Sequence, residues 1–421
     1  MKAEIIAVGS ELLTPDRLDT NSLFLTEQLN RFGIEVARKT VVSDDLEDIR
    51  NAFREALDRA EIVISSGGLG PTEDDRTRDA VAQLLHRRLT LNPGVLRGIE
   101  ERFRRFGRTM AEINERQAMV PEGATVLENA RGTAPGLLLE VGERLVILLP
   151  GPPGELRPIF EAEVEKHLAR RAPHVRLHHR QLRVAAMPES EVDQRIAPIY
   201  TAYADVQTTV LAAPGDIEVH FRIWSADEQA AEKRLEELLQ RATLAIGASV
   251  YATQAQTLEE VVGRELTLRQ FTLASAESCT GGLVAERITR VAGSSVFFLG
   301  GVVCYSNELK TAMVGVPAEL IASRGAVSSE VAVALAEGIR RRTGATFGVG
   351  VTGIAGPSGG SPEKPVGTVH VAVAGPGGSR ERELHLTGDR QRVRWQAAQF
   401  ALDMVRRQIQ EEQSPGANAK G

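Results

Sequence analysis

The feature that most constrains the fold of this chain is the alternation of short apolar runs with amphipathic stretches over residues 1–165. AEIIAVG (3–9) and EIVISSGG (61–68) are predicted to form strands, and NSLFLTEQLNRFG (21–33) is predicted to form a helix. Such alternation is typical of βαβ units around a mostly parallel sheet. The run LLLEVGERLVILLPG (137–151) is predicted as a hairpin that ends this sheet and precedes a closing helix.

At 421 residues the chain is too long for one ordinary core, and several domains are expected. Residues 1–168 are predicted as the α/β domain just described. The segment 166–183 is basic and contains a proline, which predicts a linker. Residues 175–252 are predicted as a small α+β domain, and residues 255–412 as a second α/β domain with four strands. The polar tail 413–421 is predicted to be disordered.

Composition narrows the class of protein. Apolar residues make up 42% of the chain and charged residues 25%, as in soluble globular proteins. A formal net charge of −6 argues against a protein built mainly to hold nucleic acid. No apolar run is long enough to span a bilayer, and the N-terminus lacks the features of a secretory signal, so no membrane partner is expected. Only two cysteines occur, Cys279 and Cys304, which fits a reducing, cytoplasmic location.

The first candidate site is SSGGLGPTEDDRT (65–77), which follows a strand and opens a helix. Its glycines let the backbone approach a ligand, and a helix N-terminus offers free N–H groups to a phosphate. Asp74 and Asp75 are predicted to lie in the first helical turn. Two carboxylates beside a phosphate need a divalent cation, most often Mg²⁺. The aspartates would also favour the helix dipole alone, but the density of glycine and polar residues favours a ligand site.

Three further polar segments are expected at the same edge of the sheet. They are GSELLTPDRLDTN (9–21), NERQA (114–118) and LPGPPGEL (149–156). Ligands in open α/β sheets bind at strand ends of this kind. Glu155 is explained equally well as a cap of the following helix.

Together, GGLGPTEDDRT, DTN, NERQA and LPGPPGEL resemble the N-terminal domain of the CinA-like family, which is similar to the molybdopterin-binding fold. The resemblance implies a three-layer domain with metal-dependent pyrophosphatase activity on ADP-ribose. It implies that Asp74 and Asp75 hold the divalent metal, Mg²⁺ or a similar transition metal. Pro15 and Arg116 stand where the family usually has glycine and lysine. The residues implied to surround the nucleotide are Glu11, Asn21, Gly67, Gly68, Gly70, Thr72, Asn114, Arg116, Gln117 and Glu155.

The second candidate site is ASAESCTGG (274–282), which also follows a strand and precedes a helix. It matches neither the phosphate-loop spacing nor the G-x-S-x-G elbow of common hydrolases. Ser278, Cys279 and Thr280 are all possible nucleophiles, and spacing leaves the choice between them open. A serine at such a turn lies near a helix N-terminus, where a developing oxyanion would be stabilised.

An active serine needs a base, and the best candidate is Lys310 in CYSNELK (304–310). A buried lysine loses its proton readily, although spacing alone favours a solvated lysine on a helix. Tyr305 is placed to orient or relay the proton. Cys279 and Cys304 are interpreted as small buried thiols without an activating partner.

Two later loops offer ligand groups. VTGIAGPSGG (351–360) ends a strand and presents backbone N–H groups. TGDRQRVR (387–394) places Arg390, Arg392 and Arg394 at the start of a helix. Arginines in this position fit a phosphate or carboxylate, and a solvated charged face is an equal explanation for Arg392.

The C-terminal part of the chain contains, in order, the motifs AESCTGG, YSNELK, GAVSSE, VTGIAGPSGG, EKPVGTV and GDRQRVR. Through these motifs it resembles the CinA C-terminal domain, the nicotinamide mononucleotide deamidase module. The resemblance implies that Ser278 is the nucleophile and Lys310 its base, with Tyr305 in the same network and no cofactor. It also suggests a homodimer. The residues implied to bind the substrate are Thr280, Gly281, Gly282, Asn307, Thr352, Gly353, Gly356, Arg390 and Arg394.

The leading hypothesis is therefore a bifunctional enzyme of pyridine-nucleotide recycling, acting on nicotinamide mononucleotide and ADP-ribose. Two alternatives stay open: a molybdopterin-handling N-terminal domain, and a regulatory protein of competence or DNA damage that acts through partners. The only support for the second is the basic segment 166–183. His174, His178 and His179 lack carboxylate or cysteine partners in sequence and are interpreted as part of a surface linker, not as a metal site.

Overall fold

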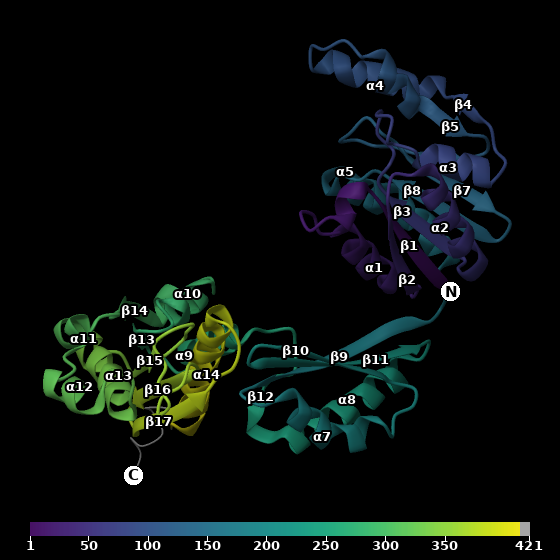
Figure 1. Cartoon of the computed structure of the whole chain (residues 1–421). Helices are drawn as coiled ribbons and strands as arrows, with labels where there is room; N and C mark the ends of the chain where they lie inside the picture. The colour runs from purple at the N-terminus through teal and green to yellow at the C-terminus, as the bar shows by residue number, and fades with distance from the viewer. Residues whose placement is uncertain (413–421) are drawn as a thin grey trace. The chain divides into compact units, whose positions relative to one another are not determined.

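The computed structural model describes residues 1–412, so the predicted disordered tail 413–421 lies outside the described residues. The chain separates into two compact units, residues 1–178 with 224–229 and the remainder from residue 179 onward. Figure 1 labels the helices and strands of both units along the chain. Within residues 1–412, no helix is both long enough and apolar enough to cross a membrane.

The first unit is built on a mixed sheet with the strand order β2-β1-β3-β8-β7-β6 (Figure 1). β1 pairs in parallel with β2 and β3, and β3 pairs in parallel with β8. β7 runs antiparallel to β8 and to β6. The strands of this sheet are β1 (Lys2–Val8), β2 (Glu35–Val42), β3 (Ile62–Ser66), β6 (Thr125–Leu127), β7 (Gly136–Val141) and β8 (Arg144–Leu149).

Helices cover both faces of this sheet, which makes the domain three-layered. Because successive side chains of a strand point to opposite faces, Ile5 joins the core under α1 and α5 while Ile6 joins the core under α2 and α3. A small separate pair, β4 (Leu89–Leu91) and β5 (Met119–Pro121), lies near α4. The helices are η1 (Ser10–Leu13), α1 (Asn21–Arg31), α2 (Leu46–Arg59), α3 (Thr77–Leu84), α4 (Pro93–Arg105), η2 (Glu112–Ala118), α5 (Pro153–Ile159), the π-helical turn η3 (Phe160–Val164) and α6 (Glu165–Arg171).

Three expectations for this part of the chain are wrong. The predicted hairpin does not end the sheet, because β6 pairs outside β7. Asp74 and Asp75 do not lie in a helical turn, because α3 begins only at Thr77. The predicted linker 166–183 is mostly regular structure, since α6 continues to Arg171 and a strand begins at residue 176.

The middle domain has a sheet with the order β10-β11-β9-β12, and one of its faces packs against α7 and α8. β10 and β11 form the predicted hairpin around Gly215. His179 lies in β9 with its ring stacked on His220, and the two rings share a 2.9 Å contact between Nε2 and Nδ1. The linker interpretation of His179 is therefore wrong, because the residue lies in a strand, although it is exposed at the surface as expected. The elements are β9 (Arg176–Ala185), α7 (Glu189–Tyr200), β10 (Gln207–Ala213), β11 (Asp216–Ser225), α8 (Glu228–Ile246), η4 (Gly247–Ser249) and β12 (Val250–Ala252).

The C-terminal domain has a sheet with the order β14-β13-β15-β16-β17. β13 lies between β14 and β15 and pairs in parallel with both, whereas β16 and β17 continue the sheet antiparallel. The fifth strand, β17 (Gly378–His385), was not predicted, because its sequence GSRERELH is charged rather than apolar. The other strands are β13 (Leu273–Glu277), β14 (Phe298–Val303), β15 (Phe347–Gly353) and β16 (Thr368–Gly375).

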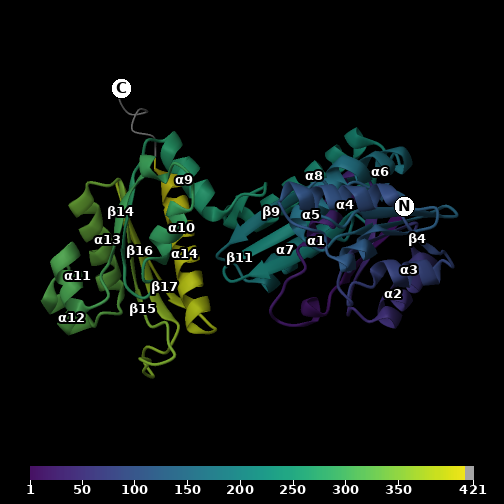
Figure 2. The ribbon, with the colours of Figure 1, turned by 90° about the horizontal axis from the view of Figure 1, so that it is seen from above.

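Helices again cover both faces of this sheet. Figure 2 shows α9, α10 and α14 on one side of it and α11, α12 and α13 on the other. The ends of β13, β14 and β15 therefore open between two helical layers, and the second candidate site lies there. The helices are α9 (Leu258–Leu268), α10 (Leu283–Thr289), η5 (Ser294–Val296), α11 (Asn307–Val314), α12 (Ala318–Arg324), α13 (Ser329–Thr343) and α14 (Arg390–Glu411).

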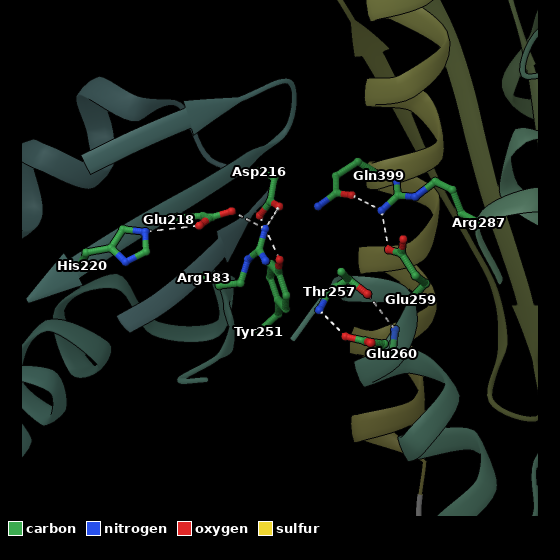
Figure 3. A network of polar contacts seen from close by, with 10 residues as sticks. All are labelled: Arg183, Asp216, Glu218, His220, Tyr251, Thr257, Glu259, Glu260, Arg287 and Gln399. Atoms are coloured by element: carbon green, nitrogen blue, oxygen red, sulfur yellow. Dashed lines mark hydrogen bonds and ion pairs between the residues drawn. The ribbon is translucent and has the colours of Figure 1, made fainter. Parts of the chain in front are cut away.

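Polar networks fix the segment that joins the middle and C-terminal domains (Figure 3). On the middle domain, Arg183 pairs with Asp216 at 2.6 Å, and the Tyr251 hydroxyl donates to the same carboxylate at 3.0 Å. On the C-terminal domain, the buried Arg287 guanidinium donates to Glu259 at 2.7 Å and to Gln399 at 2.6 Å. These bonds tie α9, α10 and α14 together beside the turn that carries Ser278.

Candidate active sites

The turn after β13 presents Ser278 at the middle of the C-terminal sheet. The Ser278 N–H donates to the Val351 carbonyl of β15 at 2.9 Å, which continues the strand pairing up to the serine. Gly281 and Gly282 then adopt φ values of 61° and 91°, in the left-handed region that favours glycine. The two predicted glycines therefore shape the turn, and Ser278 stays 8% exposed at its start.

Glu277 is a site residue that the sequence reasoning missed. Its carboxylate is 1% exposed and accepts from the N–H groups of Val284 at 3.0 Å and Ala285 at 2.9 Å, and from the Ser275 hydroxyl at 3.2 Å. Two backbone N–H groups in the first turn of α10 are thus already hydrogen-bonded to the buried Glu277 carboxylate. The expectation that these helix amides stabilise an oxyanion is wrong for the two amides that Glu277 occupies.

Lys310 is the group that stands beside the serine. Its Nζ lies 3.2 Å from Ser278 Oγ and donates to the Tyr305 carbonyl at 3.1 Å. The residue is 2% exposed, and burial lowers the pKa of its amine, because the charged form loses its hydration. Ser306 caps α11 by accepting from the Leu309 N–H at 3.2 Å, which places Lys310 in the first turn of that helix. The solvated-lysine alternative is therefore excluded.

Tyr305 contributes through its backbone more than through its ring. Its carbonyl holds Lys310, while its hydroxyl accepts from Arg390 Nη2 at 2.9 Å. The side chain is 57% exposed. Within residues 1–412, no hydrogen bond joins the Tyr305 hydroxyl to Ser278 or Lys310. The ring is therefore placed at the mouth of the site.

The predicted arginines brace the loops around the serine. Arg394 donates to the Thr280 carbonyl from Nε at 3.1 Å and from Nη2 at 2.7 Å. Arg390 Nη1 donates to the Gly356 carbonyl at 2.8 Å. The Thr352 hydroxyl donates to the Ala326 carbonyl at 2.7 Å. The other two predicted residues lie at element ends, Asn307 at the start of α11 and Gly353 at the end of β15.

The rival nucleophiles are in less reactive surroundings. Cys279 is 5% exposed, and burial raises the pKa of its thiol to about 12. Burial likewise raises the pKa of the Cys304 thiol. Thr280 is fully buried, and its hydroxyl has no hydrogen-bond partner within the described residues. Of the groups in this turn, Ser278 is the one with a base at hydrogen-bond distance.

The first unit holds a cavity of about 400 Å³ at the ends of β1, β3 and β8, which we call the acidic cavity. It brings together most of the predicted residues of this site. Asp44 and Thr133 also line it and were not predicted, and Gly151 lines it as part of the predicted segment 149–156. Asn21, Thr72, Asn114 and Arg116 are not among its lining residues. The predicted residues that do line it are Glu11, Gly67, Gly68, Gly70, Asp74, Asp75, Gln117 and Glu155.

A buried arginine sets the shape of the glycine loop in this cavity. Arg78 is 2% exposed and donates to the Leu69 carbonyl at 2.6 Å and the Gly70 carbonyl at 3.0 Å. Burial lowers its pKa to about 10, so the guanidinium remains charged at neutral pH. The Thr77 hydroxyl donates to the Gly67 carbonyl at 2.9 Å. The loop is therefore fixed from within and does not depend on a ligand.

The two aspartates differ in their surroundings. Asp75 accepts from the Thr72 N–H at 2.9 Å and also from the Thr72 hydroxyl, so it closes a turn of its own before α3. This turn is the reason why the helix starts later than predicted. Asp74, by contrast, is exposed.

Carboxylates dominate the acidic cavity. Glu11, Asp44, Asp74, Asp75 and Glu155 line it, and its lining contains no lysine or arginine. Arg116 instead pairs with Glu73 at 2.8 Å. Within residues 1–412, no group of three or more His, Cys, Asp or Glu side chains is gathered closely enough to hold an ion alone. These residues fit a cation such as Mg²⁺, which one or two carboxylates hold jointly with phosphate oxygens.

Two amide side chains hold the rim of the acidic cavity. Asn21 Nδ2 donates to the Gly151 carbonyl at 2.7 Å, and Asn129 Nδ2 donates to Glu155 Oε2 at 2.7 Å. Asn129 was not predicted. Asn114 donates to Gln117 Oε1 at 3.1 Å.

Comparison with known proteins decides the family. The CinA-like protein of Koribacter versatilis is 47% identical over 414 residues, covering 97% of this chain and all of the relative. The CinA-like protein of Acidobacterium capsulatum is 51% identical over 413 residues, covering 97% of this chain and all of that relative. The chain belongs to the CinA-like family.

Family models match three consecutive segments of this CinA-like chain. Residues 4–170 match the Probable molybdopterin binding domain, residues 179–252 the Damage-inducible protein CinA KH domain, and residues 255–409 the CinA C-terminal domain. The predicted fold class is thereby confirmed. The middle segment has no Gly-x-x-Gly loop, the element with which KH domains clamp a nucleic-acid backbone.

Solved structures of shorter relatives cover one part of the CinA-like chain. The protein CinA from Thermoplasma acidophilum is 37% identical, with a TM-score of 0.38, and the match covers 40% of this chain and 99% of that one. The competence/damage inducible protein CihA from Agrobacterium tumefaciens is also 37% identical, with a TM-score of 0.35 and coverage of 38% and 100%.

Proposed function

We propose that the C-terminal domain hydrolyses the carboxamide of nicotinamide mononucleotide to nicotinate mononucleotide and ammonia. The observation that carries this proposal is the buried Lys310 amine at 3.2 Å from Ser278 Oγ. A lysine of lowered pKa beside a serine hydroxyl is a nucleophile and base pair suited to amide hydrolysis. Membership of the CinA-like family supports the substrate.

The reaction follows from the arrangement of these two residues. Neutral Lys310 takes the hydroxyl proton as Ser278 Oγ bonds to the carboxamide carbon. The carbon–nitrogen bond then breaks, and Lys310 returns the proton to the leaving ammonia. Water attacks the resulting ester with Lys310 again as base, which releases the nicotinate product and restores the serine hydroxyl. Arg390, at the mouth of the site beside Tyr305, is the proposed contact for the substrate phosphate.

The test is ammonia release from nicotinamide mononucleotide by the full-length chain and two variants. Ser278→Ala is expected to lose activity, whereas Cys279→Ala, which changes the adjacent buried thiol, is expected to keep it. Full activity in Ser278→Ala together with loss in Cys279→Ala would show that the nucleophile is the cysteine. No ammonia from the wild-type protein would refute the deamidase itself.

We further propose that the N-terminal domain hydrolyses ADP-ribose to AMP and ribose 5-phosphate. The supporting observation is the acidic cavity, whose five carboxylates would repel a pyrophosphate unless a cation is bound with it, because its lining contains no lysine or arginine. Asp74 and Asp75 are the proposed holders of that divalent metal, which would neutralise the pyrophosphate when bound. The loop fixed by Arg78 keeps the glycine backbone open to the phosphates.

AMP release from ADP-ribose, measured with Mg²⁺ and with a chelator, tests this second activity. Turnover without divalent metal, or full activity in Asp75→Ala, would refute it. The match to the Probable molybdopterin binding domain favours one competing function. Tighter binding of molybdopterin than of ADP-ribose would support that alternative.

The family resemblance also supports a homodimer that works in the cytoplasm. Sedimentation of the purified full-length chain tests the oligomeric state, and a monomer at working concentrations would contradict it.

A further inference from the structure

The first unit contains a second cavity, of about 440 Å³, between α4 and the loop 128–135. We call it the α4 cavity. Gly98, Ile99 and Arg102 of α4 line one side, and Asn129 and Thr133 line the other. Its volume lies within the range of roughly 300–1,000 Å³ that small-molecule sites occupy. Nothing in the nucleotide chemistry proposed so far uses it.

The α4 cavity adjoins the acidic cavity across a fixed wall. Thr133 lines both cavities. Between them, Asn129 donates to Glu155 Oε2 at 2.7 Å and to the Ala134 carbonyl at 2.8 Å. On the other side, Arg102 Nη1 donates to the Ala130 carbonyl at 3.0 Å. The loop is therefore tied both to α4 and to the rim of the acidic cavity, so the two cavities form neighbouring compartments.

The lining of the α4 cavity differs in charge from that of the acidic cavity. Arg102 and Arg105 are balanced by Glu101 and Glu128, so the formal charge of the lining is zero. A free phosphate would gain little net attraction there. The remaining surface includes apolar side chains, namely those of Val95, Ile99, Val126 and Pro135.

A neutral, planar heterocycle fits this combination of groups. Its faces would lie against the apolar side chains and the flat guanidinium groups. The acidic cavity next to it is the compartment for a charged pyrophosphate that arrives with a cation. A dinucleotide-like substrate that spans both compartments would place its nucleoside in one and its pyrophosphate in the other.

We infer that the α4 cavity is the nucleoside subsite of the N-terminal site and binds the adenosine part of the substrate, an inference that rests on the proposed pyrophosphatase. The pyrophosphate lies across Thr133 in the acidic cavity, and the ribose 5-phosphate end extends away from α4. The purine therefore provides binding energy at a distance from the bond that breaks.

Gly98 offers a direct test. A Cβ placed at Gly98 meets no atom within 4 Å, so a side chain there enters the open cavity without a clash. Gly98→Leu fills the space and replaces glycine by a better helix former, so α4 is not destabilised. Gly98→Ala adds one methyl group and provides a graded control. Glu100→Leu adds a leucine at an exposed position of α4 that does not line the cavity.

Binding of AMP and of ribose 5-phosphate to the full-length protein, each with Mg²⁺, would be measured by calorimetry. Gly98→Leu is expected to weaken AMP binding at least about tenfold and to leave ribose 5-phosphate binding unchanged. Gly98→Ala should have a smaller effect and Glu100→Leu none. Wild-type affinity for AMP in Gly98→Leu, loss of ribose 5-phosphate binding instead, or no AMP binding by the wild type would each overturn the inference.

Turnover separates this inference from the activity on which it rests. If the wild-type protein releases no AMP from ADP-ribose but binds AMP in a manner sensitive to Gly98→Leu, the pyrophosphatase fails and the nucleoside subsite stands. If ADP-ribose is cleaved and Gly98→Leu leaves its KM unchanged, the pyrophosphatase stands and the subsite is refuted.

Discussion

Replacement of Lys310 by methionine and by arginine tests the chemistry of the deamidase site most sharply. Methionine keeps the length and flexibility of the side chain but removes the amine. Arginine keeps the positive charge but stays protonated, so it does not serve as a base. If Lys310 acts as a base, both variants lose activity alike. If it acts only as a cation that stabilises an oxyanion, arginine retains much of it.

The structure sets the expected magnitude. The Lys310 amine lies 3.2 Å from Ser278 Oγ, at the limit of direct proton transfer. Loss of a general base of this kind costs about 10²–10⁴-fold in kcat, or about 3–5 kcal/mol of transition-state stabilisation. Because burial lowers the pKa of Lys310, the wild-type rate should rise with pH through that lowered value, as the amine becomes neutral. This rise of the rate with pH, the acidic limb of the pH profile, should be absent from the residual activity of both variants.

The assay is ammonia release at saturating nicotinamide mononucleotide over a range of pH, with thermal unfolding as the check on folding. Lys364→Met is a matched control, since Lys364 Nζ also donates to a backbone carbonyl, that of Arg324 at 3.2 Å, outside the Ser278 turn. It should keep the acidic limb. An unchanged pH profile in Lys310→Met, or near wild-type kcat in Lys310→Arg, would refute the role of Lys310 as base.

Two further substitutions probe groups that support the two sites, and a third probes a histidine of the middle domain. Glu277→Gln leaves one amide of α10 facing an NH₂ group, so the C-terminal domain should lose about 2–4 kcal/mol in denaturant unfolding, whereas Glu286→Gln at a partly exposed ion pair should lose little. Arg78→Met leaves two loop carbonyls without a donor and should abolish AMP release and lower the unfolding midpoint of the first unit; an unaffected rate would contradict the role of Arg78. Partial desolvation of the ring and the nearby charge of Arg222 lower the pKa of His179 to about 4, below the ordinary value of about 6.5. Protonation therefore favours the unfolded chain, and stability should fall as the pH drops from about 6.5 toward about 4. The unfolding temperature should decrease less with falling pH in His179→Gln than in the wild-type protein. Equal decreases in the two proteins would contradict the role of His179.

The overall fold was accessible from sequence because the core strands carry their own signal. The apolar runs at 3–9 and 61–68 became β1 and β3, since a strand buried on both faces needs apolar side chains throughout. β17 lacks that signal, because it is an edge strand with charged side chains on its exposed positions. The segment 166–183 gave no strand signal for a similar reason. The first positions of β9 are mostly basic and polar, and its fully buried apolar residues begin only at Leu182.

Site features that depend on a short local motif, such as a glycine turn, could be predicted from the sequence. Features that depend on contacts between residues far apart in the sequence could not. The glycines after Ser278 and those before Asp74 predicted tight turns, and several of them have positive φ in the structure. The burial of Lys310 could not be read from CYSNELK, because the helices that bury it come from elsewhere in the chain. Arg78 was missed because its partners are backbone carbonyls, which no sequence pattern identifies. Asn129 was missed because its carboxylate partner, Glu155, is distant in the sequence.

The burial of the two cysteines has a practical consequence for work in solution. Cys279 and Cys304 are the only thiols of the chain, and both are shielded and held in the unreactive protonated form. Thiol-directed reagents should therefore leave the folded protein unmodified. A cysteine introduced at an exposed position such as Glu100 would then be the one site that accepts a fluorophore or spin label. The native cysteines would therefore not compete with a label introduced at a chosen position.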